Sequence, residues 1–391
     1  MRTTVGIIGG GPSGLLLARL LHRAGVDCVV LESRQRAYVE RRQRAGILEQ
    51  STVDALREAG AAERLDAEGL VHDGIELRWG GGRSHRIDFP SLASGRRVWV
   101  YAQTEVVKDL IALRLADGAP LHFGAEVTSV EGVDTDRPVV TYVQEGRTRT
   151  LTCDYVVGCD GFHGVTRAAV PGAARTTYER TYPYSWLGIL ADVPPSCDEL
   201  VYAHSSRGFA LHSMRSPDVS RLYLQVPNGT DPASWSGEQI WDELDFRLAR
   251  DGRQLERGPI TAKSVLPMRS SVTEPMRFGR LFLAGDAAHI VPPTGAKGLN
   301  LAAADVVVLA RALIRQRTAG STDLLDAYSD TCLRRVWRAE HFSWFMTTTL
   351  HTDPEQSGFD TRLQISQLER IASSPHAAAE LASNYAGLPI P

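Results

Sequence analysis

Apolar and polar positions alternate in blocks at the start of the chain. Thr3–Ile8 has the continuous apolar character of a buried strand, Leu15–Ala24 has helical spacing, and Val26–Leu31 has the character of a second buried strand. A run of glycines separates the first strand from the helix. This order of strand, turn, helix and strand predicts an α/β fold for the beginning of the chain.

The rest of the chain divides into strand-rich and helix-rich parts. Short pieces of alternating apolar and polar residues, typical of antiparallel strands, fill residues 75–101, 121–157 and 182–227. Helical spacing returns in the segments Thr104–Leu115, Trp241–Leu248, Leu299–Leu313, Leu324–Leu350 and Leu363–Tyr385. Gly387 and Pro389 predict the end of the last helical run.

Composition excludes several classes of function. The 391 residues are 43% hydrophobic, enough for two domains with cores, and the net charge of −3 gives no general reason to expect nucleic acid or a membrane as partner. The five cysteines are scattered without a Cys-x-x-Cys pair, which argues against a disulfide framework and a zinc site. The N-terminus lacks a signal-peptide core, and no apolar run is long enough to span a membrane. We therefore expect a soluble, cytoplasmic protein without a metal.

The glycine-rich turn after the first strand carries the first candidate chemistry. Gly9, Gly11 and Gly14 form a Gly-x-Gly-x-x-Gly pattern, and Glu32 ends the second strand. Glycines let the backbone approach a pyrophosphate, the helix N-terminus favours its negative charge, and the acid accepts hydrogen bonds from ribose hydroxyls. The combination predicts a nucleotide cofactor.

Two later strands end beside an aspartate–glycine pair. One precedes Asp160 and Gly161, and the other precedes Gly285 and Asp286. An aspartate that leaves a buried strand next to a helix start can hold a sugar or polyol hydroxyl, and an ordinary strand-to-helix turn is the alternative at each position. Two such turns in one chain indicate a large, extended cofactor.

The arginine-rich segment Arg34–Arg44, interrupted by Tyr38, allows two interpretations. A solvated helix face is the usual role of such a run. A phosphate-binding patch is the alternative, because the guanidinium fork matches phosphate oxygens. His72 lies between glycines that indicate a turn, where a single histidine is more often structural than catalytic.

Together, Gly9–Gly14 with Glu32, Cys159-Asp160-Gly161, and Gly285-Asp286 resemble the single-component FAD aromatic hydroxylases. Further similarity at residues 44–50, 155–164 and 281–301 extends the resemblance over essentially the whole chain. It implies a mixed α/β and α+β chain, with a Rossmann-like FAD-binding domain interleaved with an antiparallel-sheet substrate domain. The boundaries that we expect are 1–180 with 269–330 for the FAD-binding domain, with a possible strand insertion at 75–101, then 181–268 for the substrate domain and 331–391 for a C-terminal helical region.

The resemblance implies a set of FAD contacts. Asp286 matches a contact to the ribityl chain, and residues 297–300 match the segment beside the isoalloxazine ring. The implied cofactor-binding residues are Gly9, Gly11, Ser13, Gly14, Glu32, Arg42, Arg44, Gln103, Asp160, Asp286, Lys297, Gly298, Leu299 and Asn300.

The resemblance also implies an aromatic acid substrate, 4-hydroxybenzoate, which would be hydroxylated to 3,4-dihydroxybenzoate. Ser213, Arg215 and Tyr223 match the residues that hold the substrate carboxylate, a role for which arginine is suited by its paired donors. Arg221 matches an arginine that favours the phenolate form of the substrate and the seated flavin.

At the phenol end of the implied substrate, Tyr202 and Tyr385 match two phenols that contact and deprotonate the hydroxyl. His72 matches the outer end of this proton path, where we expect an imidazole near solvent. Pro293, through its backbone carbonyl, and Thr294 match residues beside the reacting ring carbon.

The implied co-substrates are a reduced nicotinamide and O2. The nicotinamide would reduce the flavin, and O2 would then add to the reduced flavin as a C4a-hydroperoxide. NADPH is favoured because clustered arginines suit a 2′-phosphate, but residues 33–36 depart from the pattern of strict NADPH users, so NADH is also possible. The implied nicotinamide-binding residues are Arg34, Tyr38, Arg42, Arg44, His163 and Arg269. A homodimer is the implied assembly.

Three alternatives stay open. His212 and Met214, which flank Ser213 in the carboxylate-binding segment, depart from the family pattern and allow an amino- or dihydroxybenzoate as substrate. A flavoprotein that binds an aromatic acid without oxygenating it is the second alternative. The third is a simple NAD dehydrogenase, which would purify colourless.

Overall fold

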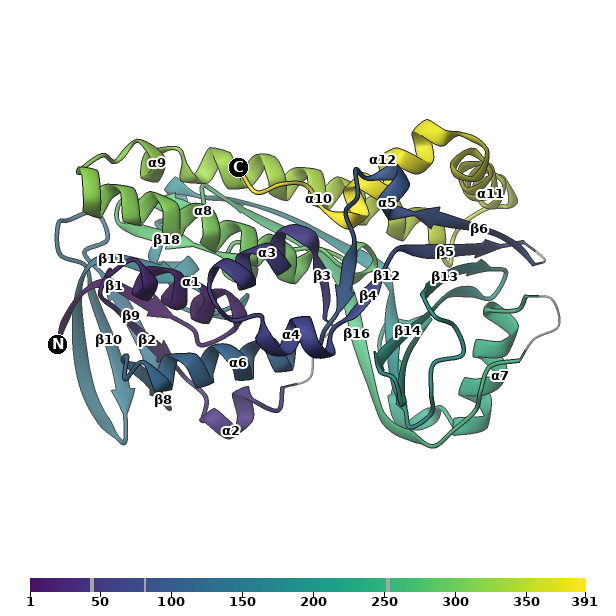
Figure 1. Cartoon of the computed structure of the whole chain (residues 1–391), viewed down its shortest axis with the longest axis horizontal. Helices are drawn as coiled ribbons and strands as arrows, with labels where there is room; N and C mark the ends of the chain where they lie inside the picture. Colours follow the sequence, from purple (N-terminus) through teal and green to yellow (C-terminus); the bar gives the residue numbers. More distant parts are fainter. Residues whose placement is uncertain (43–45, 81, 251–253) are drawn as a thin grey trace.

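The computed structural model of the chain describes residues 1–42, 46–80, 82–250 and 254–391. Arg44, expected to contact both FAD and the nicotinamide cofactor, lies outside these described residues. The described part contains two eight-stranded sheets and one three-stranded sheet. Figure 1 shows the first sheet toward the end of the molecule that carries the N-terminus and the second sheet toward the opposite end.

The first sheet is a mixed sheet with a parallel centre. Its strand order is β17–β18–β11–β1–β2–β8, with β10 paired to β11 and β9 paired to β10. The pairs among β18, β11, β1, β2 and β8 are parallel, whereas β17, β10 and β9 pair antiparallel. The strand bounds are β1 (Arg2–Ile8), β2 (Cys28–Glu32), β8 (Leu121–Phe123), β9 (Glu126–Glu131), β10 (Val139–Gln144), β11 (Arg147–Gly158), β17 (Arg277–Phe278) and β18 (Leu281–Leu283).

The parallel register brings the candidate motifs to one edge of this sheet. Ile8, the last residue of β1, lies opposite Leu31 of β2 and Gly158 of β11, and Gly158 also lies opposite Leu283 of β18. Each of the four strands is followed within a few residues by a glycine or acidic residue that the sequence singled out. These motifs therefore meet at the carboxyl ends of parallel strands.

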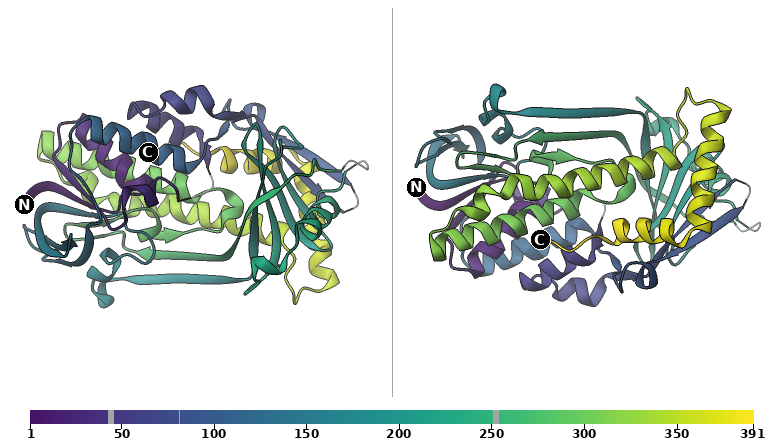
Figure 2. Two further views of the ribbon diagram at one scale, coloured as in Figure 1. Left: turned by 90° about the horizontal axis from the view of Figure 1, so that it is seen from below. Right: turned by 90° about the horizontal axis from the view of Figure 1, so that it is seen from above.

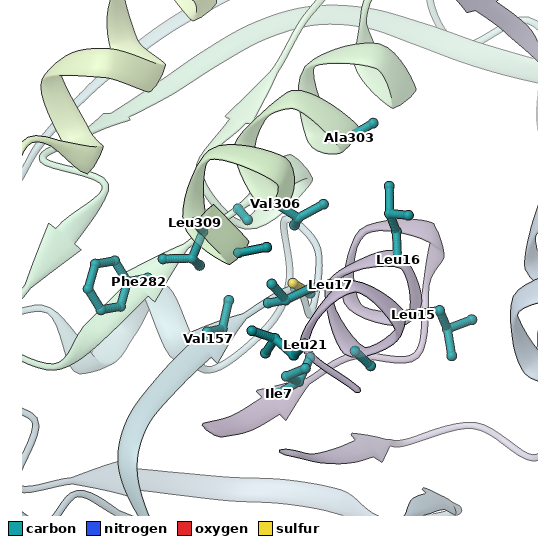
Figure 3. Close-up of a cluster of buried hydrophobic side chains, with 14 of the residues drawn as sticks. Ile7, Leu15, Leu16, Leu17, Leu21, Val157, Phe282, Ala303, Val306 and Leu309 are labelled. Atoms are coloured by element: carbon teal, nitrogen blue, oxygen red, sulfur yellow. The ribbon is translucent and has the colours of Figure 1, made fainter. Parts of the chain in front are cut away.

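Helices α1 (Pro12–Arg23) and α8 (Gly298–Ala319) pack against each other and against the first sheet. Figure 3 shows side chains from both helices and from β1, β11 and β18 converging in one apolar cluster. Burying a side chain of this kind contributes about 1.5–3 kcal/mol, so the cluster fixes the start of α8 relative to the sheet edge. The labelled side chains, each at most 3% exposed, are Ile7, Leu15, Leu16, Leu17, Leu21, Val157, Phe282, Ala303, Val306 and Leu309.

The second sheet is almost entirely antiparallel. Its order is β19–β16–β12–β15–β14–β13–β5–β6, and the pair of β13 with β5 is parallel. The strand bounds are β5 (Gly74–Trp79), β6 (Arg83–Asp88), β12 (Thr176–Ala191), β13 (Leu200–Ser205), β14 (Gly208–Ser216), β15 (Val219–Pro227), β16 (Ile260–Glu274) and β19 (His289–Ile290).

The two faces of the second sheet pack against different helices. Helix α7 (Gly237–Arg247) covers one face through an apolar cluster that contains Leu222 and Leu224. Helices α11 (Gly358–Ser373) and α12 (Pro375–Ala386), with α10 (Tyr328–Leu350), pack against a second cluster that contains Tyr202 and Tyr223. Through α10 and α12, this second face and its aromatic residues connect to the start of α8, which belongs to the motifs expected to bind FAD.

The expected domain boundaries fall inside continuous strands. β12 and β16 pair with each other on both sides of positions 181 and 269, so the chain has no linker at either point. The strands expected as an insertion of the FAD-binding domain at 75–101 are chiefly β5 and β6, and they extend the second sheet through the pair with β13.

The third sheet and the remaining helices connect the two larger sheets. β7 lies between β3 and β4 and pairs antiparallel with each. The two views in Figure 2 show α8 and α10 running together along one side of the molecule. The bounds of these elements are β3 (Ile47–Glu49), β4 (Leu70–His72), β7 (Val98–Val100), α2 (Arg36–Val39), α3 (Gln50–Glu58), α4 (Glu63–Glu68), α5 (Phe89–Leu92), α6 (Gln103–Ala116) and α9 (Asp323–Asp326), with short 3-10 turns η1 (Thr166–Ala169), η2 (Gly172–Ala174), η3 (Pro232–Ser234), η4 (Gly285–Ala287) and η5 (Pro293–Gly295).

The last helical run is two helices rather than one. The spacing at 363–385 predicts a continuous run, but α11 ends at Ser373 and α12 begins at Pro375. Proline at the first helical position cannot donate the backbone hydrogen bond that a continuing helix needs. Ser374 caps α12 by accepting a hydrogen bond from the Ala377 amide at 3.4 Å. The break turns α12 so that Tyr385 reaches the second sheet.

Among the described residues, none of the helices combines the length and the apolar character needed to cross a bilayer.

Candidate active site

The glycine turn after β1 is shaped for close approach of a ligand to the backbone. A Cβ on Gly9 would lie 2.2 Å from the Cys159 carbonyl oxygen, and a Cβ on Gly14 would lie 2.1 Å from the Gly9 carbonyl oxygen. Gly11 differs, because nothing lies within 4 Å of its Cβ direction at the start of α1. The turn is therefore tight on the protein side and open on the side where a pyrophosphate would meet the helix N-terminus.

Glu32 is held in place by backbone amides of the same region. Its two carboxylate oxygens accept hydrogen bonds from the Gly10 and Arg34 amides, each at 2.7 Å. Oε1 also accepts from the Ser33 hydroxyl at 3.4 Å, and Oε2 keeps a further lone pair for a ribose hydroxyl. The residues at this end of the sheet thus fit the adenosine half of FAD.

Asp286 and Asp160 differ in what their side chains contact. Asp286 is exposed although its neighbours Gly285 and Ala287 are buried, and among the described residues its carboxylate has no hydrogen-bond or ion-pair partner. Such a carboxylate suits a polyol hydroxyl. Both oxygens of Asp160 bind Thr166, accepting from its amide at 3.0 Å and its hydroxyl at 2.5 Å. Asp160 therefore shapes its own loop, and a direct FAD contact of its carboxylate stays a prediction.

The start of α8 contacts the β3 segment through two buried side chains. The Lys297 Nζ atom donates to Glu49 at 2.6 Å, and burial lowers the pKa of this amine although Glu49 opposes the shift. The Asn300 amide donates to the Ile47 and Ala296 carbonyls and accepts from the Glu49 amide and the Thr52 hydroxyl, all between 2.8 and 2.9 Å.

The side chains of Lys297 and Asn300 are thus engaged with the protein. What residues 297–300 offer to a flavin ring are the backbone amides of the first turn of α8, which have no partner within the helix. Nothing lies within 4 Å of the Cβ direction of Gly298, so this end of the helix is open to a flat ring. Ser13 is the second residue of α1 and is 8% exposed, and Gln103 is the first residue of α6.

The substrate-binding candidates lie on one face of three adjacent strands. Tyr202 of β13 and Tyr223 of β15 both lie opposite Leu211 of β14, and Ser213 of β14 lies opposite Arg221 of β15. Side chains two residues apart in a strand share a face. These groups therefore form one surface, called the substrate wall below, with polar atoms at the two tyrosines and at the Ser213–Arg221 pair. The strand register thereby gathers residues that the sequence places up to 21 positions apart.

The carboxylate-binding candidates Ser213, Arg215 and Tyr223 lie on this wall together with a second arginine, Arg221. The Arg221 Nε atom donates to the Tyr223 hydroxyl, and Arg215 follows Ser213 by two residues on β14. Burial and the neighbouring Arg221 charge lower the pKa of Arg215. Among the described residues the Arg215 guanidinium makes no hydrogen bond or ion pair. A half-buried guanidinium beside a second cation favours an incoming carboxylate.

A buried pair of phenols closes the wall on the other side. The Tyr202 and Tyr385 hydroxyl oxygens lie 2.6 Å apart, and both residues are 1% exposed. Burial raises the pKa of Tyr202 most, and the neighbouring Tyr385 raises it further. Burial also raises the pKa of Tyr385, so both phenols stay protonated at neutral pH. The Tyr385 carbonyl also accepts from Lys297 at 3.0 Å, which connects the phenol pair to the start of α8.

Pro293 and Thr294 lie in the 3-10 turn η5 just before α8. The Thr294 side chain is fully buried, and its hydroxyl accepts a hydrogen bond from Thr347 of α10 at 2.9 Å. Ala296 follows in a left-handed conformation, with φ of 54°. The turn is thus held from α10 on one side and leads directly into the open helix start on the other.

His72 is not near solvent, contrary to the expectation from sequence. It ends β4, it is 2% exposed, and its Nδ1 atom has no hydrogen-bond partner in the described structure. Burial lowers the pKa of this imidazole, and nearby Glu199 and Asp73 oppose the shift. No direct hydrogen bond joins His72 to Tyr202 or Tyr385 in the part of the chain that is described. The imidazole lies on the edge strand of the third sheet, and its neighbours there cover it.

The nicotinamide candidates form two separate groups. Arg34 lies over the exposed Tyr38 ring at 5.5 Å. Arg269 lies over the Phe162 ring at 3.9 Å, and His163 contacts the same ring edge-on at 5.1 Å. No hydrogen bond, ion pair or ring contact joins the two groups among the described residues. Arg42 is exposed and follows the first group in the sequence, and its carbonyl accepts a hydrogen bond from the Thr104 hydroxyl at 3.3 Å.

The two residues that depart from the family pattern face different ways. The His212 ring accepts a hydrogen bond from the Ser196 amide at 3.1 Å, and burial lowers the pKa of this histidine to about 4. Because His212 alternates with Leu211 and Ser213, it lies on the far face of the sheet. Met214 belongs to the same apolar cluster as Tyr202 and Tyr223, so it borders the substrate wall.

Sequence reasoning missed the aromatic layer behind the substrate wall. The Trp186 indole donates to His351 at 2.6 Å, and His351 stacks on Phe209 at 4.3 Å and on Tyr184 at 4.8 Å. The Tyr223 ring contacts Trp186 at 4.8 Å. Since Trp186 and His351 are 165 positions apart, no local pattern signals their pairing.

Comparison with known proteins agrees with this geometry. The family described as FAD binding domain matches residues 2–343. A p-hydroxybenzoate hydroxylase of Acinetobacter baylyi is 50% identical over 390 residues, which cover 100% of this chain and 96% of the relative. A 6-methylpretetramide 4-monooxygenase of Streptomyces rimosus is 27% identical, over 83% of this chain and 58% of that protein.

A solved structure shares the fold at lower identity. The p-nitrophenol 4-monooxygenase of Pseudomonas putida superposes with a TM-score of 0.84 at 21% identity and covers 99% of both chains. The mixed α/β fold expected from the sequence is confirmed, as is the family suggested by the glycine and aspartate motifs. The chain belongs to the FAD-binding family and is a flavin-dependent aromatic monooxygenase.

Proposed function

We propose that this protein hydroxylates 4-hydroxybenzoate at the carbon next to its hydroxyl and forms 3,4-dihydroxybenzoate, with NADPH and O2 as co-substrates and water as the second product. The proposal is carried by the wall of the second sheet, which offers a carboxylate site beside Arg215 and a buried phenol pair at Tyr202 and Tyr385. The 50% identity with p-hydroxybenzoate hydroxylase over the whole chain supports the same substrate.

The carboxylate end of the substrate is bound by Arg215, with Ser213 and Tyr223 as further donors. The Tyr223 hydroxyl accepts from Arg221 and so directs its own proton away from that arginine, toward the substrate carboxylate. Two cations beside one carboxylate offset its cost of desolvation. This end fixes the ring in one orientation along the strand face.

The phenol end is bound by Tyr202, whose hydroxyl reaches Tyr385 in turn. A free phenol has a pKa near 10, so the substrate needs a route for its proton to become the electron-rich phenolate. Tyr202 accepts that proton while it passes its own to Tyr385, and we assign His72 to the outer end of the route. The positive charge of Arg221 favours the resulting phenolate.

The chain also supplies the contacts to FAD. When bound, FAD carries electrons from NADPH to oxygen and delivers one oxygen atom to the ring. The glycine turn with Glu32 suits its adenosine half, Asp286 suits the ribityl chain, and the open start of α8 suits the flat ring. We assign the Pro293 carbonyl and Thr294 to the side of the reacting ring carbon, and the burial of Thr294 and Gly295 helps to exclude water from the reaction.

Three finer assignments belong to this proposal. The exposed Arg34–Tyr38 group and the Arg269–His163 group bind NADPH, with NADH as the weaker alternative. The chain forms a homodimer, in keeping with the exposed aromatic residues Trp337, Trp344 and Phe359 at 42%, 38% and 71% exposure. The unpaired state of all five cysteines supports a cytoplasmic location.

Product analysis tests the proposal. The purified protein would be incubated with NADPH, O2 and, separately, 4-hydroxybenzoate, 4-aminobenzoate and 2,4-dihydroxybenzoate. We expect 3,4-dihydroxybenzoate in near proportion to the NADPH consumed with 4-hydroxybenzoate only. Preferential turnover of another benzoate would assign the related substrate, and hydrogen peroxide without a hydroxylated product would assign a flavoprotein that binds aromatic acids without oxygenating them.

A further inference from the structure

One buried carboxylate outside the substrate wall binds two points of the same loop. The Asp305 Oδ2 atom accepts a hydrogen bond from the Gly285 amide at 2.9 Å and contacts the His289 Nε2 atom at 2.7 Å. Asp305 lies in the second turn of α8 and is 1% exposed, and His289 is 2% exposed. Burial alone would lower the pKa of His289, but the Asp305 carboxylate raises it above its usual value. The two side chains therefore form a buried histidine–carboxylate contact, and Asp305 makes one further hydrogen bond to the Gly285 amide.

The loop closed by this carboxylate contains most of the groups assigned to the flavin. Residues 285–305 begin with Gly285 and Asp286, continue through η5, and enter α8. Asp305 joins the end of this segment back to its beginning, so the segment is a closed loop with a fixed base. Its middle is held separately by Asn300, which binds Ile47 and Glu49.

The Gly285 amide, which donates to Asp305, immediately precedes Asp286, the residue assigned to the ribityl chain. Gly285 has a left-handed conformation, with φ of 59°, and the Asp286 side chain follows it into the exposed position described above. A Cβ on Gly285 would lie 3.0 Å from the Ala302 Cβ, so α8 also limits the turn sterically. The orientation of the Gly285–Asp286 peptide thus depends on the buried contact between Asp305 and the Gly285 amide, which lies behind the residue that faces the ligand.

We propose that Asp305 is a positioning residue for FAD: by holding the Gly285 amide and pairing with His289, it fixes the direction in which Asp286 presents its carboxylate to the ribityl hydroxyls. Asp305 itself does not touch the cofactor in this arrangement. The proposal rests on the assignment of Asp286 to the ribityl chain within the function proposed above.

Two observations separate this role from ordinary core packing. The core side chains around α1 and α8 are hydrophobic and fill space, whereas Asp305 binds both Gly285 and His289 by hydrogen bonds. Tyr328 of α10 offers a matched comparison, because its hydroxyl donates to the Leu283 carbonyl at 2.8 Å just before the loop begins. That bond stabilises β18 without touching the Gly285 amide.

The test measures the dissociation constant of FAD from apoprotein prepared as wild type, Asp305→Asn, Asp286→Asn, the double variant and Tyr328→Phe, together with the circular dichroism and melting temperature of each apoprotein. We expect Asp305→Asn to weaken FAD binding at least tenfold, because the neutral amide cannot hold both His289 and the Gly285 amide in the same geometry. The FAD dissociation constant of Tyr328→Phe should stay within about twofold of the wild-type value, even if its melting temperature falls as far as that of Asp305→Asn.

The double variant distinguishes action through Asp286 from a general structural effect. We expect it to bind FAD no more weakly than the weaker single variant, since both changes remove the same contact. A folded Asp305→Asn apoprotein with unchanged FAD affinity, or full additivity in the double variant, would overturn the proposal. If Asp305→Asn does not fold, Asp305→Glu carries the test, with the same tenfold loss expected from its displaced carboxylate. A wild-type protein that bound FAD but did not hydroxylate 4-hydroxybenzoate would contradict the proposed function and leave this result intact.

Discussion

The hydroxyl oxygens of Tyr202 and Tyr385 lie 2.6 Å apart in a fully buried contact between β13 and α12. Tyr385 also binds Lys297 through its carbonyl, so a single residue joins the substrate wall to the loop that precedes α8. Phe89 stacks on the Tyr385 ring at 5.2 Å and fixes its plane. The phenol pair is therefore rigid, and its geometry is set before any substrate binds.

Replacing Tyr202 with phenylalanine tests the proton route. Tyr202→Phe removes the hydroxyl that accepts the substrate proton, and we expect the rate of hydroxylation to fall about 100-fold, the usual worth of a positioned acid–base group. Reduction of the flavin by NADPH should fall much less, because it does not require the phenolate. Stopped-flow spectroscopy of the two half-reactions measures both rates.

The matched control is Tyr184→Phe. Tyr184 is buried in the same apolar cluster as Tyr202, but its hydroxyl has no hydrogen-bond partner among the described residues. Both half-reactions should keep wild-type rates in this variant. Equal losses in the two half-reactions of Tyr202→Phe would argue that the change disturbs the fold of the pocket and would remove the assigned role.

Arg215→Ala tests the carboxylate site. The variant would leave the substrate carboxylate without its principal cation in a half-buried position, a loss of about 3 kcal/mol, which corresponds to a dissociation constant weaker by roughly 150-fold. Arg215→Lys should recover part of the affinity, because a lysine keeps the charge but loses the paired donors. Substrate binding is measured by perturbation of the flavin spectrum. Arg207→Ala, which removes an exposed arginine paired with Glu243, is the control, and an unaltered dissociation constant in Arg215→Ala would exclude the site.

The parts of the site that follow from local spacing were predictable from the residues themselves. Gly9 and Gly11 lie between β1 and α1, Gly14 lies in the first turn of α1, and Glu32 ends β2, because the order of apolar runs already sets that topology. Asp286 is similarly placed by the short strand before it. In each case a turn of a few residues sets the geometry, and few competing arrangements exist for it.

The substrate wall depends on contacts that no local pattern encodes. Tyr202 and Tyr385 are 183 positions apart, and the Lys297–Glu49 contact spans 248. Strand register and helix orientation determine such pairs, and only the resemblance to a known family indicated the role of those tyrosines. The single helical run expected at 363–385 shows the same limit. The break that orients Tyr385 occupies only Ser373, Ser374 and Pro375, which is too short to interrupt the helical spacing on either side.

His72→Asn tests whether the imidazole carries the substrate proton outward. The imidazole is buried, and among the described residues no hydrogen bond joins it directly to either phenol, so its role needs a test of its own. If His72 is the carrier, the proton released on substrate binding at pH 7 should appear at least about tenfold more slowly in the variant, with no change in the substrate dissociation constant. A pH-indicator dye in a stopped-flow instrument measures the release. His85→Asn, on strand β6 of the second sheet, should release the proton at the wild-type rate, and wild-type release in His72→Asn would remove the histidine from the route.

Glu340 predicts a pH dependence of stability that originates next to the flavin loop. The residue is 5% exposed on α10, and its Oε1 atom has no hydrogen-bond partner in the described structure. Burial raises its pKa to about 7, against the opposing effects of Ser270 and of His289, the histidine paired with Asp305. Tyr182 is the other titratable group whose pKa Glu340 influences.

The sign of the effect follows from the raised pKa. The folded protein holds the Glu340 proton more tightly than the unfolded chain, so the stability that this group contributes is present below about pH 4.5 and is lost as the pH rises through about 7. Glu340→Gln mimics the protonated form at every pH. The variant should therefore match the wild type near pH 4.5 and exceed its free energy of unfolding by about 3 kcal/mol at pH 8.

Urea unfolding of FAD-saturated wild type and Glu340→Gln at pH 5 and pH 8 measures this difference. Glu355→Gln, which changes an exposed glutamate on the loop after α10, should match the stability of the wild type at both pH values. A stability difference between Glu340→Gln and wild type that stays constant from pH 5 to pH 8 would show that Glu340 ionises normally in the folded protein. A difference that grows with pH would establish a buried carboxyl whose ionisation loosens the helix beside His289, and so would couple protonation in this layer to the loop that Asp305 closes.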